Sequence, residues 1–85
     1  MQLSDLVIKI LGIAGVTEAE AQQTLDTILA RYPDVKNAVG RFQDYAYMKL
    51  QELLDVDTAI GLTKKIGSEL ASGHPSYDPD HWVIP

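Results

Sequence analysis

Hydrophobic side chains recur every three to four residues along most of the chain, which is the spacing of one face of an α-helix. Short polar or glycine-containing stretches interrupt this pattern and divide it into segments. The segments predict four helices, at approximately 4–12, 18–32, 34–55 and 58–72. We therefore expect an all-α fold, a small bundle of three to four helices over 1–73. An extended, Pro-rich C-terminal tail should follow over 74–85.

Polar residues at the predicted helix starts support these boundaries. Ser4 is a favourable N-cap for the first helix, and Thr17 followed by Glu20 forms a capping-box motif for the second. Asp34 is placed to cap the third helix. For the fourth helix, Asp57 is the expected N-cap, because residues 55–58 read as a short connection.

Glycines and prolines mark where the predicted helices end or weaken. Gly12 and Gly15 should end the first helix, and Pro33 should stop the second because it disfavours helical geometry in the residue before it. Gly61 and Gly67 lie inside the last predicted helix, where glycine is unfavourable. We interpret both as sites of close approach between helices.

Composition narrows the class of protein. Eighty-five residues fit one small domain, and 46% hydrophobic with 22% charged residues is typical of a folded chain. Seven basic and twelve acidic residues give a net charge of −5, which repels phosphate backbones, so no nucleic acid partner is expected. The absence of cysteine excludes disulfides and thiolate chemistry, and it favours a reducing compartment.

The most apolar stretch runs from Leu6 to Val16 and is too short to cross a membrane, which requires about 20 residues. No basic residue precedes it, so it does not resemble a signal peptide. We therefore expect no membrane partner and no secretion through a signal peptide. A cytoplasmic or virion location is predicted.

Candidate catalytic groups are confined to the tail. His74 and His81 lie near Ser76 and Asp78, so the groups of a Ser/His/Asp triad are nominally present. A triad also requires a base that a third group holds rigidly in a site from which water is excluded. A Pro-rich tail does not supply that by itself. No enzyme, catalytic residue or cofactor is therefore predicted.

The same segment is the only candidate for a metal site. His74, Asp78, Asp80 and His81 could converge, but their spacing matches no standard zinc or calcium loop. We interpret them as turn residues, with a turn near residues 78–80, and predict no metal ligand. A metal-dependent site in the tail remains a further alternative.

Large apolar side chains near the end of the chain are the least ordinary feature of the sequence. The candidate partner-binding residues are Tyr77, Trp82, Val83 and Ile84. Two interpretations are open and do not exclude each other. The tail could fold back as a lid on its own bundle, or it could insert Trp82 into a neighbouring subunit, since aromatic residues are enriched in interface hot spots.

These observations favour a non-enzymatic structural or interaction protein that is one small helical subunit of a larger assembly. Its partners should be proteins, in a homo-oligomer or a multi-subunit complex, and a bacteriophage or virus particle is the leading expectation. The alternative is a small acidic regulatory binder or inhibitor of a host protein. That alternative predicts acidic side chains clustered on one exposed face.

Overall fold

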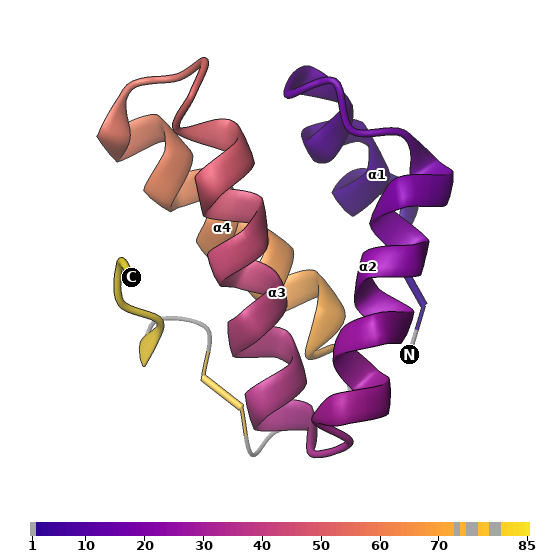
Figure 1. The fold of residues 1–85 in the computed structure, drawn as a ribbon. Coiled ribbons are helices and arrows are strands. Elements are labelled where there is room, and N and C mark those ends of the chain that lie inside the picture. The colour runs from indigo at the N-terminus through magenta and orange to yellow at the C-terminus, as the bar shows by residue number, and fades with distance from the viewer. Residues whose placement is uncertain (1, 73, 75–76, 79–80) are drawn as a thin grey trace.

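The computed structural model describes residues 2–72, 74, 77–78 and 81–85 and confirms the all-α fold. Four helices follow one another along the chain (Figure 1), namely α1 (Asp5–Ile13), α2 (Glu18–Arg31), α3 (Val35–Leu50) and α4 (Val56–Leu70). No strand occurs among these described residues. Within the same residues, no helix is both long enough and apolar enough to cross a bilayer.

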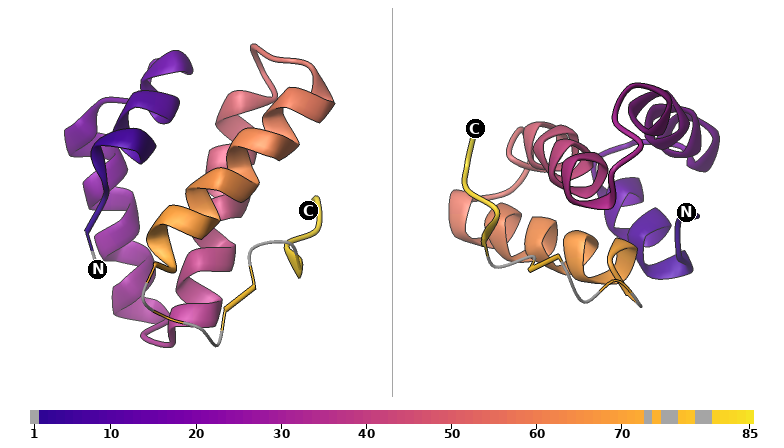
Figure 2. Two further views of the ribbon diagram at one scale, coloured as in Figure 1. Left: turned by 180° about the vertical axis from the view of Figure 1, so that it is seen from behind. Right: turned by 90° about the horizontal axis from the view of Figure 1, so that it is seen from below.

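Helix α3 is the central element of the bundle. It packs mainly against α4 and α2, while the short α1 contacts all three of the other helices. The α2–α3 connection lies at one end of the molecule, and the α1–α2 and α3–α4 connections lie at the opposite end (Figures 1 and 2). The successive helices α2, α3 and α4 therefore run in alternating directions, as short connections favour.

The predicted apolar stripes meet in one core. Phe42 and Leu50 of α3, Leu25 of α2, Leu11 of α1 and Ile66 of α4 are all fully buried. Each side chain of this size stabilises the fold by about 1.5–3 kcal/mol when it leaves water. Burial of the stripes therefore explains why helices of only 9–16 residues persist in this chain.

Three predicted N-caps are confirmed. Ser4 Oγ accepts a hydrogen bond from Val7 N at 3.3 Å, and Thr17 Oγ1 accepts one from Glu20 N at 3.1 Å. Asp34 caps α3 in the same way. The Glu20 carboxylate also accepts a hydrogen bond from the Tyr45 hydroxyl at 3.0 Å, which ties the start of α2 to α3.

The predicted N-cap of the last helix is wrong by two residues. Asp55, not Asp57, caps α4, accepting hydrogen bonds from Thr58 N at 3.2 Å and Thr58 Oγ1 at 2.6 Å. These bonds, led by that from the hydroxyl, lower the pKa of Asp55 and keep it ionised. Helix α3 ends at Leu50, short of the predicted residue 55, and the extended backbone of the Asp55 cap excludes a helix at residue 55 itself.

The two glycines of α4, Gly61 and Gly67, differ in the space around them. A Cβ placed on Gly67 would lie less than 3.0 Å from the side-chain amide of Gln43, so the prediction of a close helix–helix approach is confirmed there. A Cβ on Gly61 would meet nothing within 4 Å, so the same prediction is wrong at that position. The close contact explains one of the two glycines only.

This difference predicts opposite effects of the same substitution. Gly61→Ala should raise the free energy of unfolding by about 1 kcal/mol through helix propensity. Gly67→Ala should lower it by about 1 kcal/mol, because displacing buried Gln43 breaks a hydrogen bond and outweighs the propensity gain. Urea denaturation of the two variants beside the wild type measures both values, and a stabilised Gly67 variant would contradict the close contact.

Candidate functional site

The tail folds back on its own bundle and rests on α3. The Trp82 side chain is only 9% exposed, and its indole Nε1 donates a hydrogen bond to Asp44 Oδ1 at 2.8 Å. Its ring also packs on Tyr47, with 5.5 Å between ring centroids and planes tilted by 53°. Asp44 and Tyr47 are three residues apart on one face of α3, so they hold both the polar and the apolar part of the indole.

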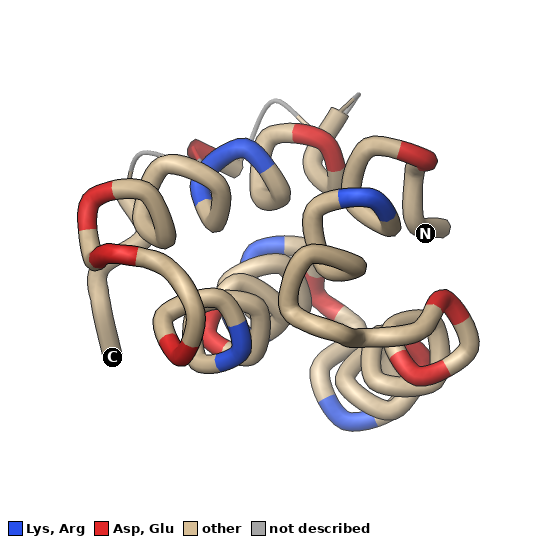
Figure 3. Tube along the Cα trace, turned by 90° about the horizontal axis from the view of Figure 1, so that it is seen from above, with Lys and Arg blue, Asp and Glu red and all other residues tan. Residues whose placement is uncertain are grey.

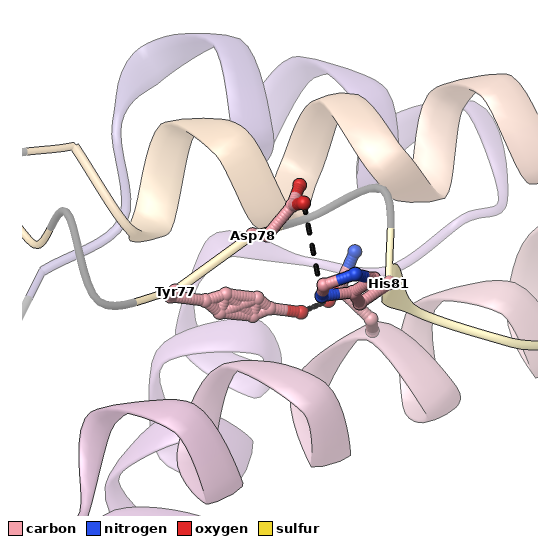
Figure 4. A network of polar contacts seen from close by, with 4 residues as sticks. Tyr77, Asp78 and His81 are labelled. Atoms are coloured by element: carbon pink, nitrogen blue, oxygen red, sulfur yellow. Dashed lines mark hydrogen bonds and ion pairs between the residues drawn. The ribbon is translucent and has the colours of Figure 1, made fainter.

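A second contact joins the tail to the interior of the bundle. The Tyr77 hydroxyl donates a hydrogen bond to Gln43 Oε1, one of the contacts drawn in Figure 4. Gln43 is fully buried, and its Nε2 donates to the backbone oxygen of Thr63 at 3.1 Å. One buried amide therefore links the tail, α3 and α4, and both of its polar ends are satisfied.

The environment of Tyr77 keeps its phenol neutral. Burial, reinforced by the negative charges of Asp44 and Asp78, raises the pKa of Tyr77 to about 12. The hydroxyl is therefore protonated throughout the physiological range, and it can act as the donor to Gln43. Deprotonation would place a negative charge against the amide oxygen that now accepts the hydrogen bond.

The four predicted partner-binding residues divide into two pairs. Tyr77 and Trp82 point towards the protein's own α3, as the lid interpretation requires. Val83 and Ile84 remain 79% and 46% exposed. The tail therefore combines an inward pair, which fixes its position, with an outward apolar pair that is available for contact.

A groove with a volume of about 490 Å³ lies between the tail and the N-terminal half of α3. We call it the tail groove. On the α3 side it is lined by Lys36, Asn37, Gly40, Arg41 and Asp44. The tail contributes Trp82 and Val83, together with the polar residues near the turn. Its volume is in the range of small-molecule sites in proteins.

In the tail groove the carboxylates have partners, whereas the basic side chains of α3 do not pair with a described carboxylate. Asp44 accepts the indole hydrogen bond, and Asp78 Oδ2 lies 3.7 Å from His81 Nδ1 (Figure 4). Among the described side chains, this His81–Asp78 pair is the only ion pair, so neither Lys36 nor Arg41 has a carboxylate of a described residue within 4.0 Å. Hydrogen-bond donors of positive charge thus remain available along the α3 wall.

The metal alternative gains no geometric support. Within the described part of the chain, no three His, Asp or Glu side chains come close enough together to hold an ion. His81 N donates a hydrogen bond to Asp78 O at 3.0 Å, while residues 79 and 80 of the predicted turn lie outside the described residues. Asp80, which belonged to the proposed ligand set, and Ser76, the nominal nucleophile, lie outside the described residues.

The sequence analysis did not identify the surface of α3 that the tail contacts. Gln43 and Asp44 hold Tyr77 and Trp82, and neither was singled out. For Gln43 a signal existed, because it interrupts the apolar stripe four residues after Val39. A polar residue on a buried helical face usually has a specific hydrogen-bond partner.

Comparison with known proteins adds no relative. The chain matches no protein-family model, and neither a curated protein nor a solved structure matches it. Functional inference therefore depends on the tail and its groove.

Trp82 should contribute strongly to stability if it docks on its own α3. We expect Trp82→Ala to lower the free energy of unfolding by about 3 kcal/mol, the scale of removing a buried tryptophan. Val83→Ala, one residue away but exposed, should change it by less than about 0.5 kcal/mol. Thermal or urea denaturation at low protein concentration compares the two, and equal effects would contradict intramolecular docking.

Docking of the tail should weaken at alkaline pH. Because the folded pKa of Tyr77, about 12, exceeds the unfolded value of 10.0, its stabilising contribution is complete below pH 10 and is lost as pH rises towards 12. Emission of Trp82, the only tryptophan, should shift to the red over this range. In Tyr77→Phe the shift should be much smaller, while circular dichroism monitors the helices in both proteins.

Proposed function

We propose that this protein is a non-enzymatic subunit of a larger protein assembly and that its tail is a contact element. The observation that carries the proposal is that the tail has one docked aromatic residue followed by two exposed apolar residues. Trp82 is fixed on α3, and the next two residues, Val83 and Ile84, present apolar side chains to water. Fixing Trp82 limits the motion of its neighbours, so less conformational entropy is lost when a partner covers them.

Isolated apolar side chains on a surface are normal and indicate little by themselves. The exposed pair in the tail is different because the two residues are adjacent and follow a docked aromatic residue. The buried cores of protein interfaces are more apolar than the rest of the surface, and an adjacent exposed apolar pair fits such a core. A bacteriophage or virus particle is the assembly that we propose first, on the basis of small size and the lack of a recognised catalytic motif.

The alternative of an acidic inhibitor receives less support. Acidic side chains stand at the starts of all four helices, where they cap the helix or interact with its dipole. Figure 3 accordingly shows acidic positions on opposite sides of the molecule. An inhibitor of a basic site would need a single dominant acidic face.

The proposal predicts that the outward pair is required for assembly. The double variant Val83→Asp/Ile84→Asp should keep the helical circular dichroism of the wild type but lose its higher-mass species in light scattering. Ile13→Asp is the matched control, because Ile13 is a similarly exposed apolar residue on α1. It should leave the mass unchanged. A wild-type protein that stays at 9.4 kDa at all accessible concentrations, alone and in its native extract, would overturn the proposal.

A further inference from the structure

The connection between α3 and α4, together with the first two residues of α4, forms an exposed acidic and apolar surface, residues 52–57, which we call the acidic corner. Its apolar residues Leu53 and Val56 are 65% and 52% exposed. Glu52, Asp55 and Asp57 are also exposed, and the segment contains no basic residue. Figure 3 looks down on this end of the molecule and shows the acidic positions along the connection.

The α3 wall of the tail groove offers complementary chemistry. Lys36 and Arg41 lie in this wall without a carboxylate partner among the described residues. The two carboxylates that also line the groove are engaged within it, Asp44 by the indole of Trp82 and Asp78 by His81. Arg41 is positioned by Tyr32, since its guanidinium carbon lies 4.1 Å from the centre of that ring. Trp82 and Val83 supply apolar surface on the other wall. The groove can therefore receive a segment that carries carboxylates next to aliphatic side chains.

Gly40 keeps this groove open. It lies inside α3, where glycine costs about 1 kcal/mol relative to alanine. No packing contact explains it, because a Cβ at this position would meet nothing within 4 Å. Gly40 lines the groove, so a larger side chain here would occupy space that is now empty.

We propose that the tail groove of one copy binds the acidic corner of a second copy of this chain. The inference rests on the proposed function and deepens it by naming the partner surface. Lys36 and Arg41 would pair with carboxylates of the corner, and Leu53 and Val56 would contact the apolar wall of the groove.

The contact must form between copies. Gly40 is followed by ten further residues of α3, a rigid spacing of about 15 Å, before the helix ends at Leu50 and the corner begins. A corner therefore cannot enter its own groove. Because the two surfaces differ, they can join copies into a pair in which both contacts form, or into a ring or chain.

Charge reversal tests the contact directly. Reversing the charges of the groove with Lys36→Glu/Arg41→Glu should reduce the mass of the particle, measured by sedimentation or light scattering, to that of the 9.4 kDa monomer. Reversing the corner with Glu52→Lys/Asp57→Lys should do the same, and Asp55 is left intact because it caps α4. Mixing the two reversed proteins should restore the higher mass, because each groove again meets a corner of opposite charge.

The matched control is Lys9→Glu/Lys65→Glu, which changes the net charge by the same amount at two other exposed lysines. It should assemble like the wild type. A second variant needs no charge change: Gly40→Leu should fill the groove and abolish assembly while helicity is kept or increased.

The outcomes separate this contact from the general proposal. If the wild type assembles and the reversed and Gly40 variants assemble equally well, the groove–corner contact is wrong although the protein is still an assembly subunit. Failure of the two reversed proteins to recover mass on mixing also overturns the contact. A protein that is monomeric under all conditions overturns both inferences.

Discussion

The arrangement of the C-terminal part depends on one buried amide. Gln43 would be costly inside the bundle if its polar atoms were left without partners. It donates to the backbone of Thr63 in α4 and accepts from the Tyr77 hydroxyl in the tail. A glycine at position 67 leaves the space that the amide fills. One buried polar side chain thus links α3 to α4 and also gives the tail a hydrogen-bond partner on α3.

Docking of the tail follows from this constraint and has two consequences. Once Tyr77 is positioned, Trp82 reaches Asp44 and Tyr47 on the next part of α3, so the indole is shielded from water. The tail then forms one wall of a groove whose other wall is the basic N-terminal half of α3. The same docking leaves Val83 and Ile84 in water. A contact that stabilises the monomer therefore creates the surfaces that we propose for assembly.

Several features could be predicted from local sequence because their physical causes are local. The apolar spacing gave the four helices, and three of the four N-caps were correct because capping involves residues only three positions apart. The error at Asp57 arose where two acidic residues competed for one cap. Asp55 is the cap because the amide and the hydroxyl of Thr58 both donate hydrogen bonds to its carboxylate.

By itself, then, the sequence determined the helix content, most helix limits and the presence of an apolar tail, because these depend on periodicity and on neighbours within one turn. The destination of the tail was decided only by tertiary structure. Contacts between residues 34 and 38 positions apart, Tyr77 with Gln43 and Trp82 with Asp44, cannot be read from spacing along the chain. The tail groove likewise exists only after α3 and the tail are brought together, since neither segment contains both of its walls.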